Sequence, residues 1–152
     1  MGNGGFLGSA DGNSGFSAYG GTFGVYDNFV HLGPLKLGGD ARYFQDTSSN
    51  SNPNTTGNKL HGGLAGLRLA LNLPLIPFRP YVQAEVGGVG TNYGTQPNTV
   101  GVFAYQVQGG LDFTIFPHLD LRAEYGGGTI RAYGSNDRQS LQTAGLGAVV
   151  RF

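Results

Sequence analysis

The chain of 152 residues contains no cysteine and no tryptophan, and it has a single methionine. Without cysteine it forms neither a disulfide framework nor a thiolate metal site. Charge is scarce as well, because only 12% of residues are charged. The nine basic residues equal the nine acidic ones in number, so the formal net charge is zero. The basic surface with which proteins bind nucleic acid is therefore missing, and we expect no nucleic-acid partner.

Long apolar runs are also missing. The longest stretch of apolar residues and glycine is the seven-residue segment Ala144–Val150, whereas a membrane-spanning helix needs about 18 apolar residues. The sequence therefore excludes a transmembrane helix.

Motifs for cofactors and catalysis are absent too. There is neither a phosphate-binding G-x-x-x-x-G-K-[ST] loop nor a G-x-G-x-x-G between a strand and a helix. His31 and His118 fall in predicted short turns, while His61 falls at the opposite end of a predicted strand, so a shared metal site or triad is disfavoured. His61 with a loop serine is the one hydrolase candidate, and an ordinary rim histidine is the favoured interpretation. We expect no cofactor, no metal and no catalysis.

Alternation of apolar and polar residues is what the sequence has in abundance, together with 29 glycines. In residues 103–115 the odd positions are apolar or glycine and most even positions are polar, as in a half-buried strand. Leu64 is the one sizeable apolar residue that breaks such a pattern. The predicted strands are residues 4–10, 16–26, 35–45, 59–73, 78–88, 103–115, 121–125 and 144–152. The chain is thus predicted to be a single all-β domain of eight strands over residues 1–152.

The connections between these strands alternate in character. Compact turns that contain proline are expected at Asp27–Pro34, Pro74–Pro77 and Phe116–Asp120, and polar loops at residues 11–14, 46–57, 91–98 and 135–140. Short turns on one rim and hydrophilic loops on the other are typical of an antiparallel up-and-down transmembrane β-barrel. The chain offers about 19 residues per strand and connection (152/8), enough for the roughly 9–11 residues of one crossing.

Charged side chains gather on one face of the predicted strands. This face carries Lys36, Arg42, Arg68, Arg79, Arg122, Arg131 and Arg151 with Asp40, Glu85, Asp112 and Glu124. The other charges (Asp11, Asp27, Asp46, Lys59, Asp120, Asp137 and Arg138) fall in turns, loops or strand ends, which leaves the middle of the apolar face uncharged. A soluble barrel of the lipocalin type would bury these eleven charges inside. The pattern therefore predicts lipid outside and a lumen filled with polar side chains.

Two interpretations of this lumen stay open. The favoured one pairs its cations and anions into ion pairs that fill the interior, because buried charges must be compensated. The alternative is a narrow, weakly anion-selective path, because seven basic groups exceed four acidic ones by three. Tandem glycines are expected to make room for long arginine side chains from the neighbouring strands in the lumen. Arg131 is out of phase with Arg122, so a register shift is predicted within Gly126–Gly128.

The C-terminal run Ala144–Phe152 carries a terminal aromatic residue with apolar residues at alternate positions before it. With glycine-rich strands such as Gln108–Phe113, it resembles small bacterial outer-membrane β-barrels of the porin family and OmpA-like type. The resemblance implies assembly by the barrel-assembly machinery, which would recognise Leu146, Ala148, Val150 and Phe152. It also implies contact with outer-membrane lipids and lipopolysaccharide, loops outside the cell and turns in the periplasm. The girdle residues would be Tyr19, Tyr43, Phe103, Tyr105, Phe113 and Tyr125.

We therefore expect an integral outer-membrane barrel with a structural, adhesive or anchoring role and no catalysis. The alternatives are the anion channel described above and a self-assembling barrel subunit of a polymer, in which the apolar belt or a sheet edge left by a short first strand meets another copy. The fold itself specifies no activity.

Overall fold

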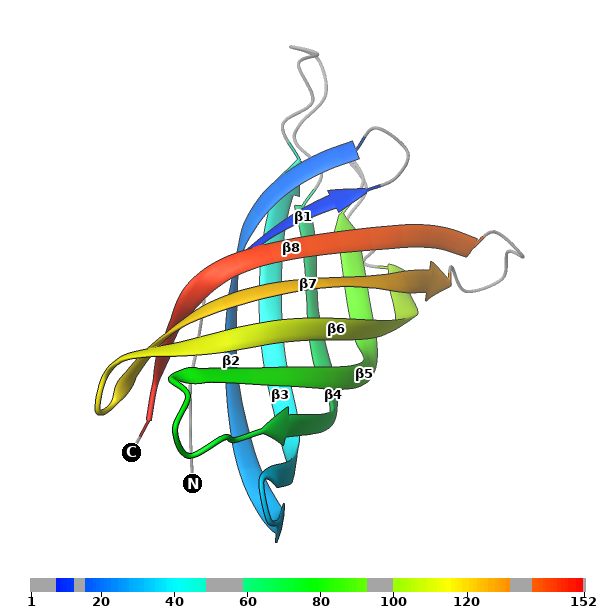
Figure 1. Cartoon of the computed structure of the whole chain (residues 1–152). Helices are drawn as coiled ribbons and strands as arrows, with labels where there is room; N and C mark the ends of the chain where they lie inside the picture. Colours follow the sequence, from blue (N-terminus) through cyan, green and yellow to red (C-terminus); the bar gives the residue numbers. More distant parts are fainter. Residues whose placement is uncertain (1–7, 13–15, 49–58, 93–99, 132–137, 152) are drawn as a thin grey trace.

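The computed structural model describes residues 8–12, 16–48, 59–92, 100–131 and 138–151, which form eight strands (Figure 1). The strands are β1 (Gly8–Gly12), β2 (Phe16–Leu32), β3 (Leu35–Ser48), β4 (Lys59–Leu71), β5 (Phe78–Asn92), β6 (Val100–Phe116), β7 (Leu119–Arg131) and β8 (Arg138–Val150). Among these residues there is no helix that is long and apolar enough to cross a membrane.

Every strand pairs antiparallel with its neighbours in the sequence, and β1 also pairs with β8, so the strand order closes on itself. The predicted all-β, antiparallel, up-and-down architecture is confirmed. Because β1 has five residues, it covers only the loop-side parts of its neighbours, residues 16–19 of β2 and 141–145 of β8. The remaining pairs run along most of each strand and give the sheet its curl (Figure 1).

The turn between β2 and β3 is shorter than predicted, and β2 is longer. β2 runs to Leu32 and β3 starts at Leu35, so Gly33 and Pro34 alone make the turn, with Gly33 at φ 62° in the left-handed region that favours glycine. The pairing of β2 with β3 shifts between Asn28 and Val30. Such a bulge exchanges the two faces of the strand, so strict alternation ends there, before the strand itself ends.

β7 is much longer than predicted. It was expected over 121–125, followed by a register shift, yet it pairs without interruption from Asp120 to Arg131, through all three glycines. The prediction of a shift within Gly126–Gly128 is wrong, and the shift in this hairpin lies between Thr114 and Phe116 instead. Gly126 makes room for a neighbouring side chain and forms no bulge, since a Cβ at this position would lie 2.5 Å from Cγ of Gln108. The side chain of Arg131 lies outside the described residues.

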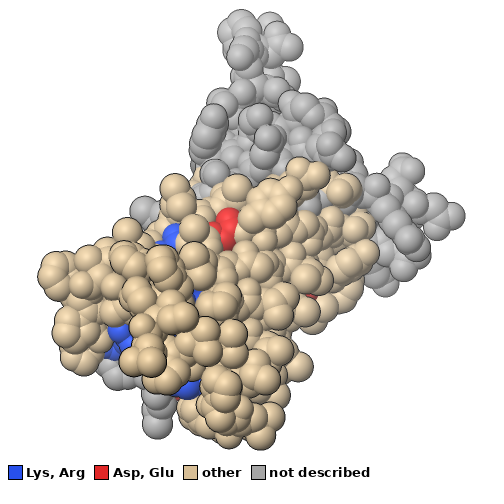
Figure 2. All heavy atoms as spheres, in the orientation of Figure 1, with Lys and Arg blue, Asp and Glu red and all other residues tan. Residues whose placement is uncertain are grey.

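The barrel is apolar outside and polar inside. Large apolar side chains such as Leu67, Val107 and Leu146 are 60%, 52% and 75% exposed, whereas Arg68 and Glu85 are each only 2% exposed. Figure 2 shows the outer wall almost free of charged atoms on the face in view. A soluble β-protein has the reverse arrangement, because there the apolar face is the one removed from water.

Candidate functional site: the charged lumen

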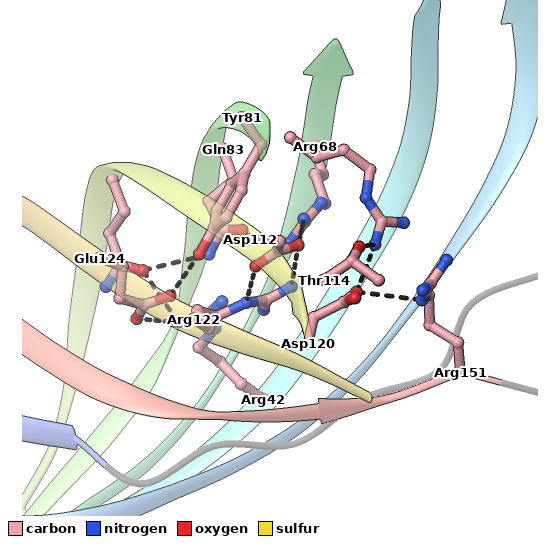
Figure 3. A network of polar contacts seen from close by, with 12 residues as sticks. Arg42, Arg68, Tyr81, Gln83, Asp112, Thr114, Asp120, Arg122, Glu124 and Arg151 are labelled. Carbon is pink, nitrogen blue, oxygen red and sulfur yellow. Dashed lines mark hydrogen bonds and ion pairs between the residues drawn. The ribbon is translucent and has the colours of Figure 1, made fainter. Parts of the chain in front are cut away.

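The lumen is built in layers, beginning with an ion-pair cluster at the turn side. Asp120 is fully buried, and its Oδ2 accepts a hydrogen bond from Nη2 of Arg79 at 2.6 Å. The same oxygen lies 3.0 Å from Nε of Arg151, the residue directly after β8 (Figure 3). Arg79 also donates to the hydroxyl of Thr114 at 2.8 Å. One carboxylate thus ties together β5, β7 and the end of β8.

A second cluster in the middle of the lumen centres on Asp112 of β6. Its carboxylate accepts hydrogen bonds from Arg68 Nη2 at 2.7 Å and from Arg122 Nε and Nη2 at 2.7 and 3.0 Å (Figure 3). The guanidinium carbon of Arg68 lies 4.2 Å from the ring centroid of Tyr26 and 3.6 Å from that of Tyr81. Two cation–π contacts therefore supplement the carboxylate, which is valuable where water is excluded.

The third cluster gathers three carboxylates around Arg42 of β3. Its Nε lies 3.0 Å from Oδ1 of Asp40 and 2.8 Å from Oε1 of Glu85, and its Nη1 lies 2.8 Å from Oε1 of Glu124. The hydroxyl of Tyr81 donates to the other oxygen of Glu124 at 2.8 Å, which links this cluster to the middle one. The second and third clusters are thus connected through Tyr81.

An apolar layer lies on the loop side of these clusters. Phe44, Leu64, Val89, Val102 and Ala104 are buried against each other, with Ile130 packed beside them. Leu64, which breaks the alternation in the sequence, points inward as its position demands and belongs to this layer. The apolar layer and the ion pairs fill successive sections of the lumen.

Glycine makes room for two of the rings inside the barrel. A Cβ on Gly110 would lie 2.3 Å from the ring of Tyr81, and a Cβ on Gly62 would lie 2.9 Å from the ring of Phe44. The large neighbours at these sites are aromatic rings, whereas the prediction had stressed arginine. A narrow eight-stranded lumen holds such rings only where the facing strand has no side chain.

The charge balance of the lumen differs from the predicted surplus. Asp46 and Asp120, predicted to lie in a loop and in a turn, are also buried in the lumen, with 5% and 0% exposure. Their even positions match those of Arg42 and Arg122, so the parity of each strand carried the signal. The described inward charges are six cations (Lys36, Arg42, Arg68, Arg79, Arg122 and Arg151) and six anions (Asp40, Asp46, Glu85, Asp112, Asp120 and Glu124).

Of the eleven charged residues predicted for the lumen, ten lie on its inner face, with Lys36, Arg79 and Arg151 half-buried near the turn side. The eleventh is Arg131, whose side chain lies outside the described residues. Lys36 makes no ion pair with any residue that the structure describes. The predicted surplus of three cations is not found among the described residues.

The residues predicted for the outer wall face outward where they are described. Tyr43, Phe103, Tyr105, Phe113 and Tyr125 are between 37% and 63% exposed. Leu146, Ala148 and Val150 of the C-terminal pattern point outward from β8. The side chain of Tyr19 and the whole of Phe152 lie outside the described residues.

The three histidines remain apart. His61 is half-buried on β4, and the serines at 49 and 51 that could join it lie outside the described residues. His118 sits in the turn after β6, where its Nδ1 lies 3.1 Å from the backbone oxygen of Arg151. The described part of the chain holds no group of His, Asp or Glu residues arranged for a metal ion.

Comparison with known proteins places this fold among outer-membrane barrels. The structure is similar to that of Neisserial surface protein A, with a TM-score of 0.67 and 19% identity over 95% of this chain and 91% of that one. It is equally similar to the outer membrane enzyme PagL, with a TM-score of 0.67 and 10% identity over 95% and 97% of the two chains. No protein-family profile matches the sequence, and a search of curated proteins finds no match. Likeness at this level of identity shows the fold.

Proposed function

We propose that the chain is an integral bacterial outer-membrane protein, a closed barrel of eight strands with a structural, adhesive or anchoring role. The observation that carries this proposal is the inversion of the two faces. Leu67, Val107 and Tyr125 are more than half exposed, whereas Arg68, Asp112 and Arg122 are 2–3% exposed. Only a solvent that is itself apolar stabilises such a wall, and an ionisable group on it would cost roughly 2–4 kcal/mol at the midplane.

The filled lumen supports a role without transport. Three ion-pair clusters and an apolar layer occupy the interior, and the described inward charges balance. An eight-stranded barrel leaves little space beyond its side chains. Under this proposal the protein acts through its outer surface, through its loops or by its presence in the membrane. Its loops lie outside the cell and its turns in the periplasm.

A catalytic role is the competing proposal, because one structural neighbour is an outer membrane enzyme. An open groove on the outer wall of β6, β7 and β8 is lined by four side chains with hydroxyl groups, Tyr105, Tyr125, Thr129 and Ser140, and by no histidine or carboxylate. A hydroxyl nucleophile needs a neighbouring base to activate it. This arrangement favours the non-catalytic proposal.

Migration of the purified protein in detergent tests the membrane barrel. A closed barrel that keeps its hydrogen bonds in detergent should migrate differently before and after boiling, whereas identical migration would contradict the proposal. Conductance across a planar bilayer then tests the filled lumen. We expect no stable unitary steps, and steps that vanish in Arg122→Leu would show a conducting lumen instead.

A further inference from the structure

An open groove lies on the outer wall, in the loop-side half of β6, β7 and β8. Its lining consists of Tyr105, Tyr125, Gly126, Gly127, Gly128, Thr129, Ser140 and Gln142, and its volume is about 370 Å³. Thr129 lies two residues before the end of β7 and Ser140 two residues after the start of β8, so one end of the groove approaches the loop-side rim.

The groove exists because one outward position has no side chain. Gly127 is paired with Val107 on one side and Gln142 on the other, and it faces outward between them. Tyr105 and Tyr125 stand beside this floor and are 48% and 63% exposed. An elongated apolar group fits between two aromatic walls over a glycine floor.

Polar side chains mark the rim end of the groove. Thr129 pairs with Tyr105 and with Ser140 in the two ladders, and Gln142 lies on the next outward position of β8. None of the described residues forms a hydrogen bond with these three side chains. Polar groups on a lipid-facing wall need a partner, since the hydrocarbon offers none. The lining holds no charged residue, so the matching partner is an uncharged acceptor.

We propose that this groove holds one acyl chain of a lipid from the loop-side leaflet. The chain lies over Gly127 between the two tyrosines, and its ester carbonyl accepts hydrogen bonds from Thr129, Ser140 and Gln142. Val107, which pairs with Gly127 of the groove floor, is 52% exposed and belongs to the apolar wall that contacts lipid under the proposed function. This inference rests on that function and adds one lipid held at a fixed place.

Tryptophan fluorescence provides the test, because the chain has no tryptophan of its own. Tyr125→Trp puts a reporter in the groove, and Tyr43→Trp puts the control on the outward face of β3, where residue 43 is 51% exposed. Each protein is folded into bilayers that contain increasing fractions of a phosphatidylcholine brominated on its chains, either ester-linked or ether-linked. At residue 125 we expect half-quenching at an ester-lipid fraction about threefold to tenfold lower than for the ether lipid. At residue 43 the two lipids should act alike.

Two further variants in the Tyr125→Trp background locate the effect. Thr129→Val with Ser140→Ala removes two donors, and Gly127→Leu fills the floor, so each should abolish the preference for the ester lipid. Equal quenching by both lipids in the protein that carries Tyr125→Trp alone would overturn the proposal. Disulfide-linked dimers of Gly127→Cys would also overturn it, because a second copy would then occupy the groove. Absence of quenching at both residues 43 and 125 would refute the membrane wall itself.

Discussion

At the scale of single residues, orientation decides the effect of a substitution. Val107 is 52% exposed on the outer wall, while the adjacent Gln106 is 6% exposed and donates to Thr143 inside. We expect Val107→Arg to lower the free energy of unfolding in lipid vesicles by about 2–4 kcal/mol. Gln106→Ala should cost about 1 kcal/mol, one hydrogen bond. Equal losses in urea titrations would show that the two faces are assigned wrongly.

Asp112 and Asp120 each contact two arginines, but the two arginines at Asp112 are almost fully buried, whereas those at Asp120 are partly exposed. We therefore expect Asp112 to be the more sensitive of the two carboxylates. Asp112→Asn leaves Arg68 and Arg122 buried without their counter-ion, and we expect a loss of roughly 3–5 kcal/mol in the free energy of unfolding. Asp27→Asn is the matched control, since Asp27 is exposed and makes no ion pair with a described residue. Comparable urea midpoints for the two variants would argue against the network as a source of stability.

At the scale of strands, the two glycines of the tandem pair Gly109–Gly110 differ in the space around them. Gly110 faces inward, where a methyl group would collide with the ring of Tyr81, while a Cβ on Gly109 would meet only a backbone oxygen at 3.9 Å. Gly110→Ala should therefore cost about 1–3 kcal/mol through overpacking. Gly109→Ala should stay within about 0.5 kcal/mol. Folding yields and urea titrations of the pair check this, and the reverse order would exclude the role in packing.

The strands also show how far alternation predicts structure. It placed the centres of β3 to β6 because each side chain there keeps its parity along the strand. It ended β2 at residue 26 because the bulge at Asn28 exchanges the faces, and it ended β7 at Tyr125 because glycines carry no polarity to alternate. Pairing through backbone hydrogen bonds continues where the side-chain pattern is silent.

At the scale of the whole molecule, the C-terminal strand is expected to govern assembly. Removal of Phe152 should slow insertion into the outer membrane of cells, as the terminal aromatic of the resembled family implies. Phe116→Ala removes another aromatic residue, 62% exposed beside a turn, and should leave the rate unchanged. The rate is followed by the appearance of the heat-modifiable form after induction. Unchanged insertion without Phe152 would count against the terminal signature.

The alternation of apolar and polar residues in the sequence was enough to decide that the chain forms β-strands and which face of each strand carries the charges. Both follow from the two-residue period of a strand. The alternation could not decide which charges meet. Arg42 and Glu124 are 82 residues apart, and Arg79 and Asp120 are 41 apart, so their contact depends on the register and curvature of strands that pair far along the chain. Closure of the barrel likewise decided what the inward positions contact: Leu64 packs in an apolar layer, and Asp120 pairs with Arg79 and Arg151.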